Sequence, residues 1–269
     1  MKDKNAIRNQ KTKRMKRNIK SLTGFKMGAV DGEIGQVEEF YFDDKTWTIR
    51  YIIVNTGSWL SNRKVLISPE AVVNPDWKQK VFPVNLTKEQ IKNSPDIDTD
   101  KPVSRQQEIK LHEYYPWRNY WSSGLWSGGI VTSGMQMPPA LSLEEAIPKD
   151  KVADRRKTTD DPNLRSTDKV IGYDIEAIDG DIGKVEDFII DDTTWRIHFM
   201  LVDTGNWFPG KKVLISPKWV KEIKWANSSV KVNVPVEHIK KSPEYDSRQE
   251  VSDSYEANLK NYYGGYVSE

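Results

Sequence analysis

Apolar residues in the first half of the chain follow the patterns of β-strands. The segment 37–42 ends in three consecutive aromatic residues, a polar turn follows at 43–46, and the segment 47–54 alternates before it becomes continuously apolar. A period of two is typical of a strand with one buried face, and a short continuous apolar run is typical of a strand buried on both faces. We therefore predict two strands joined by the turn at 43–46.

A second hairpin is predicted just before these strands. Asp31-Gly32 lies between the strand-like segments 25–30 and 34–42. Asp-Gly readily adopts the positive φ angles that a tight two-residue hairpin turn requires. Gly35 follows closely, and hairpin geometry explains these glycines better than a phosphate-binding loop, because strands flank them on both sides.

Further short strands are predicted over 65–67 and 81–86, and Thr87 resembles the cap of a short helix that Pro95 ends. Five or six short strands with one helical turn predict a small β-barrel. The predicted fold class is mainly β, with short helical segments.

The whole pattern occurs twice. Asp31-Gly32-Glu33-Ile34-Gly35 recurs as Asp179-Gly180-Asp181-Ile182-Gly183, and the constant offset between them leaves about 22 of the 39 positions from 31 to 69 identical to their counterparts. The period is too long for a solenoid repeat, so each copy is expected to be a domain. The predicted hairpin residues are Asp31, Gly32, Gly35, Asp179, Gly180 and Gly183.

The repeat sets the expected domain boundaries. We predict a basic arm over 1–18, a first barrel with an extended C-terminal strap over 19–115, a linker over 116–168, a second barrel with its strap over 169–250, and a tail over 251–269. The aromatic residues at 114–121, where the linker begins, are expected to dock on a barrel, because exposed aromatic residues at that density reduce solubility.

The amino-acid composition excludes some classes of site and bears on where the protein is expected to occur. The chain has 269 residues, 37% of them apolar, a net charge of +2 and no cysteine, so disulfides and thiolate metal sites are excluded. We expect a cytoplasmic protein, because no apolar run is long enough to span a membrane. Nine of the first twenty residues are Lys or Arg. This arm is either a solvated tail or a segment that binds nucleic acid or an anionic membrane.

The chain offers little catalytic chemistry. The three histidines, at 112, 198 and 238, have no ligand spacing and no partner pattern of a catalytic triad. The acid pairs at 43–44 and 191–192 are expected to build turns rather than hold a cation. We predict no catalytic, cofactor-binding or metal-binding residue, and therefore a protein that is not an enzyme.

Four residues are candidates for partner binding. Trp59 and Trp207 lie at equivalent loop positions, where each either covers the end of its barrel or anchors a protein partner. Ser104-Arg105-Gln106 is repeated as Ser247-Arg248-Gln249, and in an extended strap Arg105 and Arg248 would either pair with barrel acids or bind a partner's carboxylate or phosphate. A protein partner or self-association is expected, and nucleic acid is an alternative partner through the basic arm.

These motifs resemble the PRC-barrel family. The resemblance rests on the Asp-Gly-x-Ile-Gly-x-Val-x-x-Phe stretches at 31–40 and 179–188 and on the Lys-Val-Leu-Ile-Ser-Pro runs at 64–69 and 212–217. The family includes the cytoplasmic domain of the photosynthetic reaction-centre H subunit and the C-terminal domain of a ribosome maturation factor. The resemblance implies a tandem of small β-barrels that act as a protein-interaction or assembly module, without cofactors. It leaves as alternatives an RNA- or ribosome-associated factor and a reaction-centre-like accessory of electron transfer.

Overall fold

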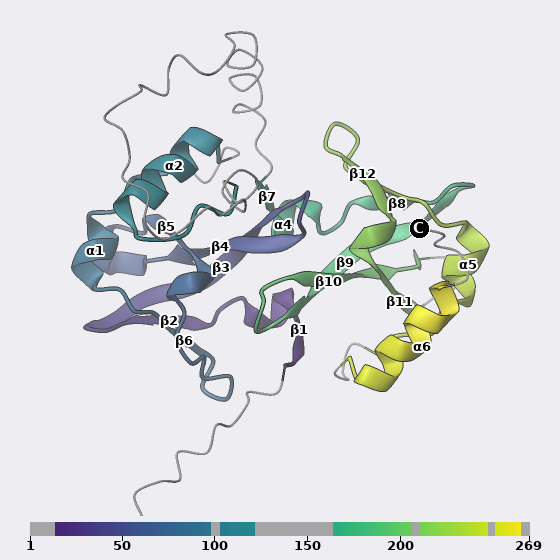
Figure 1. Cartoon of the computed structure of the whole chain (residues 1–269), viewed down its shortest axis with the longest axis horizontal. Coiled ribbons are helices and arrows are strands. Elements are labelled where there is room, and N and C mark those ends of the chain that lie inside the picture. The colour runs from purple at the N-terminus through teal and green to yellow at the C-terminus, as the bar shows by residue number, and fades with distance from the viewer. Residues whose placement is uncertain (1–13, 98–102, 122–163, 206–209, 247–250, 265–269) are drawn as a thin grey trace, which may run out of the picture. The chain divides into compact units, whose positions relative to one another are not determined.

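The computed structural model describes residues 14–97, 103–121, 164–205, 210–246 and 251–264 (Figure 1). The chain is mainly β with short helices, as the hydrophobic pattern predicts. It divides into two compact units: unit 1 contains residues up to 23, the short stretch Thr46–Ile49 and residues from 166 onward, and unit 2 contains 24–45 and 50–165. Each unit therefore contains chain from both repeats.

Unit 2 is built on the first repeat. Its sheet has the order β5-β4-β3-β2-β6, and β7 also pairs with β3. β2 and β6 run parallel, whereas β2 and β3 form an antiparallel hairpin. The strands are β2 (Lys26–Ala29), β3 (Gly32–Asp43), β4 (Thr48–Asn55), β5 (Lys64–Ile67), β6 (Val81–Pro83) and β7 (Leu164–Ser166).

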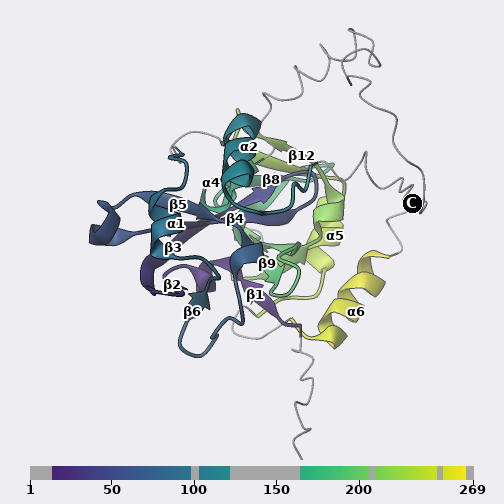
Figure 2. The same cartoon turned by 60° about the vertical axis from the view of Figure 1, so that its left-hand side comes forward.

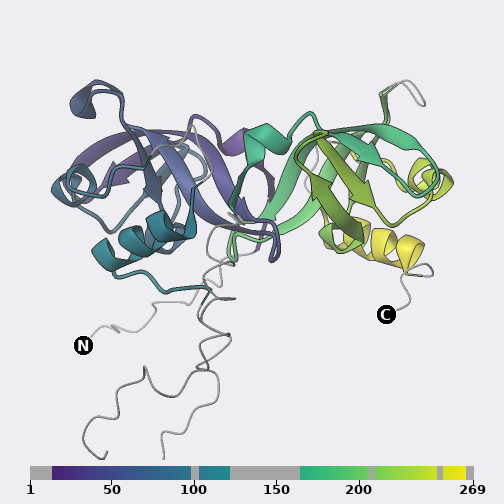
Figure 3. The ribbon, with the colours of Figure 1, turned by 90° about the horizontal axis from the view of Figure 1, so that it is seen from above.

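Unit 1 repeats this topology with the second repeat and adds one strand, β12, beyond β13. Its sheet has the order β11-β10-β9-β8-β13-β12, and β1 also pairs with β9. Figure 3 shows that the strands of each unit are strongly curved. The strands are β1 (Lys16–Asn18), β8 (Asp174–Glu176), β9 (Asp181–Asp191), β10 (Ile197–Asp203), β11 (Lys212–Ile215), β12 (Val220–Lys224) and β13 (Ser229–Val232).

The glycine hairpin differs in detail from its prediction. Ala29 pairs with Gly32, so Val30 and Asp31 occupy the two-residue turn, rather than Asp31 and Gly32. The side chain of Asp31 accepts a hydrogen bond from the amide of Lys88 (2.8 Å), the first residue of helix α1 (Lys88–Lys92). The second repeat forms a longer turn, and there Asp179 accepts from the amide of Val236 (2.7 Å), the first residue of α5 (Val236–Lys241). Asp31 and Asp179 therefore each accept a hydrogen bond from the first amide of a helix. The residues around them in the sequence do not indicate this role.

Two helices replace segments that were expected to be irregular. Residues 105–114, predicted as an extended strap, form α2 (Arg105–Tyr114), and the predicted tail contains α6 (Asp253–Tyr263) (Figure 2). Ser104 and Ser252, which are counterparts at the offset of the repeat, accept the capping hydrogen bonds. Buried Leu111 and Tyr115 have the buried counterparts Leu259 and Tyr263 at the same offset. The match of Ser104-Arg105-Gln106 with Ser247-Arg248-Gln249 was therefore a wrong alignment, because the constant offset of the repeat pairs Ser104 with Ser252 and continues through both helices.

Two expected boundaries also shift. Residues 16–18, placed in the basic arm, form β1 in unit 1. Residues 116–121, placed in the linker, belong to unit 2: Trp117 is buried, and its ring stacks on that of buried Tyr115 with centroids 4.1 Å apart. The docking of this aromatic segment is as predicted. A short helix, α4 (Thr167–Val170), follows β7.

Candidate functional site

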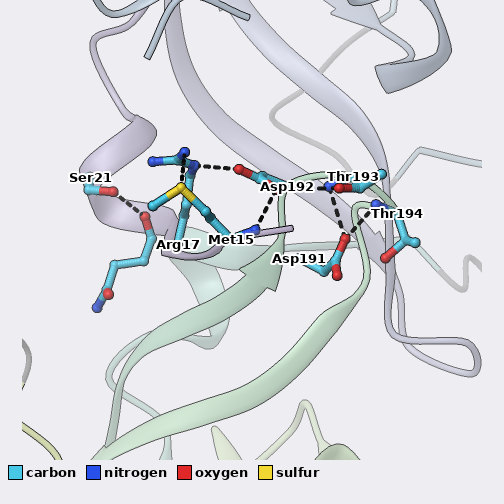
Figure 4. Close-up of polar contacts among 8 residues, drawn as sticks. Met15, Arg17, Ser21, Asp191, Asp192, Thr193 and Thr194 are labelled. Atoms are coloured by element: carbon cyan, nitrogen blue, oxygen red, sulfur yellow. Dashed lines mark hydrogen bonds and ion pairs between the residues drawn. The ribbon is translucent and has the colours of Figure 1, made fainter. Parts of the chain in front are cut away.

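Within unit 1, the edge of β9 binds a strand from the far end of the chain. β1 lies antiparallel to β9, with Lys16, Arg17 and Asn18 opposite Asp191, Ile190 and Ile189. The amide of Asp192 donates to the carbonyl of Met15 (3.0 Å), and the Met15 amide donates to Oδ1 of Asp192 (3.0 Å) (Figure 4). The short β1 is therefore fixed both by backbone pairing and by a carboxylate of the turn that follows β9.

The two acids of the 191–192 pair have different roles, as Figure 4 shows. Asp191 Oδ1 accepts from the amides of Thr193 (2.9 Å) and Thr194 (2.7 Å), which builds the predicted Asp turn. Burial opposes ionisation of Asp191, but these two amides outweigh it and hold the pKa of its carboxyl below the ordinary value. Asp192 instead binds the segment that contains β1, because its Oδ2 forms an ion pair with Nε of Arg17 at 2.8 Å.

Residues after β1 extend the attachment. Ile19 and Leu22, in the 3-10 turn η1 (Ile19–Leu22), are each 1% exposed. Buried Asp187 accepts from the Lys20 amide (3.2 Å) and from Nδ2 of Asn18 (3.2 Å). Burial raises the pKa of the Asp187 carboxyl, although these donors partly offset the effect. Segment 15–22 is thus held by a backbone ladder, two apolar anchors and two acids.

A further ion pair ties β1 to helix α6. Nζ of Lys16 contacts Oε2 of Glu256, and both side chains are largely buried. Lys260 binds the other oxygen of Glu256 at 3.0 Å. Burial opposes ionisation of Glu256, but the two lysines outweigh it and lower the pKa of this carboxyl.

Unit 2 contains the counterpart arrangement. β7 of the second repeat pairs with β3, and Nε of Arg165 lies 2.8 Å from Oδ2 of Asp44. Arg165 is the counterpart of Arg17, and Asp44 is the counterpart of Asp192, so the same ion pair occurs in both units. Burial raises the pKa of the Asp44 carboxyl despite the neighbouring Arg165. In each unit, the strand that precedes one repeat pairs with the long strand of the other repeat.

A third contact between the repeats joins residues to their own counterparts. Within unit 1, the amide of Ile49 donates to the carbonyl of Trp195 (2.8 Å), and the amide of Ile197 donates to the carbonyl of Trp47 (2.7 Å). Thr48 and Arg196, which occupy the same position in the two repeats, form the antiparallel bridge between these bonds. Such self-pairing is the signature of an isologous contact, in which one surface binds its own copy.

Unit 2 also buries a carboxylate whose neighbours differ from those of its described counterpart, Glu256. Glu108, on α2, is 2% exposed, and Nη1 of Arg105 lies 2.6 Å from its Oε2. Tyr120 and Tyr51 donate to its other oxygen, and the Tyr51 hydroxyl also lies 2.9 Å from Nε2 of His112. Burial raises the pKa of Glu108 and lowers that of His112. This cluster joins α2 and the aromatic segment to β4.

The structure describes two of the four predicted partner-binding residues, Trp59 and Arg105. Trp59 is half-buried, its Nε1 donates to the carbonyl of Ile34, and Nζ of Lys88 lies 4.5 Å from its ring centroid. Arg105 binds Glu108 on its own helix, within unit 2. Trp207 and Arg248 lie outside the described residues. Partner binding by these four residues stays a prediction.

Sequence reasoning missed the residues that attach the exchanged strands. Arg17 was counted only as part of a basic arm, and Asp192 only as a turn residue. One signal was available: the Asp-Asp turns and the arginines at 17 and 165 share the constant offset of the repeat. Within the described residues, no group of three or more metal-binding side chains occurs, and no helix there is long and apolar enough to cross a membrane.

Comparison with known protein families finds the same family model in both repeats. The family model PRC-barrel domain matches residues 27–91 and 162–239, which together make up more than half of the chain. No curated protein matches the chain.

Proposed function

The chain belongs to the PRC-barrel domain family, and from that premise we propose that it is a non-catalytic protein-interaction or assembly module. Binding takes place by strand addition along the edges of β9 and β3. The family alone does not choose a function, since one fold serves many. The proposal therefore rests on the site.

One observation carries the proposal. The edge of β9 binds β1, a segment that is distant in sequence and belongs to the other repeat, through backbone pairing and through Arg17 and Asp192. Backbone hydrogen bonds that supply affinity, with side-chain anchors that supply specificity, are the features of β-strand addition. An edge that accepts one distant segment has the chemistry to accept a segment from a partner.

The nucleic-acid alternative loses part of its basis. Lys16 and Arg17, counted among the basic residues of the arm, pair with Glu256 and Asp192 in unit 1. An RNA-associated role would then depend on the other basic residues of the arm, most of which lie in 1–13, outside the described residues, and on the aromatic segment 114–121. An accessory role in electron transfer would rest on the fold alone, and we do not propose it.

Affinity capture at two salt concentrations, with and without nuclease, tests the function. We expect the tagged chain to retain specific proteins from a native lysate at low and at moderate salt, and to retain them after nuclease treatment. Binding to phosphates weakens steeply with salt, whereas a ladder with buried anchors does so less. Retention of nucleic acid alone, lost on nuclease treatment or at the higher salt concentration, would overturn the proposal.

A further inference from the structure

The exchanged strands have the properties of an interface between two copies of one module. In unit 1 the leading strand β1 pairs with the acceptor strand β9, and in unit 2 the leading strand β7 pairs with the acceptor strand β3. The ion pairs Arg17–Asp192 and Arg165–Asp44 use the same atoms at the same distance of 2.8 Å. Reciprocity of this kind defines a self-complementary interface.

We propose that each acceptor strand is a homotypic binding site whose ligand is the leading segment of the opposite repeat, which a second copy of this chain can supply as well. This inference rests on the proposed function and names the partner. The ligand of β9 is the segment 15–22, with Arg17 bound to Asp192 and with Ile19 and Leu22 buried.

The two leading strands are not interchangeable. Lys16 of β1 and Leu164 of β7 occupy the same position in the two repeats. Lys16 pairs with Glu256, whereas Leu164 is 3% exposed. The counterpart of Glu256 in unit 2 is Glu108, which is already bound by Arg105 and two tyrosines.

Exchange of the leading strands would therefore separate Lys16 from Glu256 and leave Glu256 with Lys260 alone. β1 on β3 would place the ammonium of Lys16 at the buried position of Leu164, and β7 on β9 would remove the Lys16 partner of Glu256. An unpaired charge in a buried site disfavours the wrong partner. Lys16, Leu164 and Glu256 thus determine that unlike repeats pair.

The protein concentration decides whether an acceptor strand binds the leading segment of its own chain or that of a second chain. A covalent connection between the two repeats raises the effective concentration of the segment, so exchange within one chain dominates in dilute solution. Cutting the connection removes this advantage and makes the interface measurable.

Cleavage of the full chain tests the proposal. A recognition site for a specific protease is introduced within 122–163, and the folded protein is cut and analysed by size-exclusion chromatography and sedimentation at micromolar concentration. We expect the two fragments to remain a one-to-one complex. When two differently tagged cut copies are mixed, each first fragment should exchange onto the second fragment of the other copy.

Variants separate this interface from other contacts. Arg17→Ala with Arg165→Ala, and separately Leu164→Lys, should weaken the complex about tenfold or more, because each removes a charge-assisted bond or buries a charge. The control Lys26→Ala with Lys184→Ala removes one well-exposed ion pair in each unit and should leave the complex unchanged. Circular dichroism of each uncut variant checks that it has folded.

Three outcomes would overturn the proposal: fragments of the parent protein that separate at micromolar concentration, variants that bind as tightly as the parent, or first fragments that pair with each other as readily as with second fragments. Capture of other proteins by the uncut chain is measured independently. The proposed function can therefore stand when the homotypic interface fails.

Discussion

At the scale of single residues, Gly35 and Gly183 are the described glycines at which an added Cβ would meet the closest atoms. A Cβ placed on Gly35 would lie 2.0 Å from the carbonyl oxygen of Asn55, and one on Gly183 would lie 2.0 Å from that of Asp203. Gly183 also has a φ of 150°, which side chains rarely adopt. The register shifts in both hairpins, where Ile34 and Ile182 lie in the core, are directly beside these glycines.

Gly35→Ala should lower the free energy of unfolding by about 3 kcal/mol, because the clash is with backbone and some part of the core must move. Urea denaturation gives the value. Gly28→Ala, in the same hairpin, is the matched control, since a Cβ there meets no atom within 4 Å. Equal losses in the two variants would show that the close approach at Gly35 does not exist.

The buried Glu108 predicts a pH dependence of stability. Burial raises the pKa of this carboxyl above its ordinary value of 4.5, so the folded protein binds more protons than the unfolded chain in that range. Stability should therefore fall as the pH rises from about 4.5 through the folded pKa of Glu108. Glu108→Gln should remove this decline, which chemical denaturation across the acidic range would detect. Parallel pH profiles of the parent and the variant would contradict the assignment.

At the scale of elements, one carboxylate makes two of the contacts that hold segment 15–18. Asp192 accepts from the Met15 amide and from Arg17, whereas Asp191 accepts within its own turn. Asp192→Ala should cost about 1–3 kcal/mol, because it removes the carboxylate that two partly buried donors share.

The location of this effect distinguishes it from general loss of stability. Hydrogen exchange should accelerate in 15–18 of the Asp192→Ala variant while β10 remains protected, since β1 is a separate strand at the edge. Uniform acceleration over unit 1, or none in 15–18, would contradict the assigned attachment of β1.

Sequence patterns predicted the elements with strong local signals. The strands over 32–43 and 48–55 carried alternation followed by continuous apolar runs, and α1 carried a Thr87–Gln90 capping box. β1 and α2 were missed for physical reasons. β1 is three residues long, and its apolar anchors come after it. α2 has one fully buried apolar residue, Leu111, so its sequence lacks the apolar stripe that predicts an amphipathic helix.

At the scale of the whole molecule, the duplication was readable from the sequence, but the exchange between the repeats was not. Periodicity shows which residues form strands, and a constant offset shows that they form them twice. Neither says which repeat supplies an edge strand, because β1 pairs with β9 of the other repeat. The basic charge of the first twenty residues suggested a solvated tail or a segment that binds nucleic acid. The ion pairs of Lys16 with Glu256 and of Arg17 with Asp192 are visible only in the structure.

One measurement tests the exchange of chain between repeats most directly. The native chain has no cysteine, so Thr48→Cys with Arg196→Cys introduces a single pair, at the non-hydrogen-bonded position of the bridge in unit 1. Antiparallel residues at such positions have Cα atoms about 4.5 Å apart, which fits a disulfide. We expect mild oxidation of the dilute protein to form this disulfide within one chain, seen as a faster band on a non-reducing gel and as the loss of two hydrogen masses by mass spectrometry. Free thiols after oxidation, or only crosslinks between chains in dilute solution, would contradict the account.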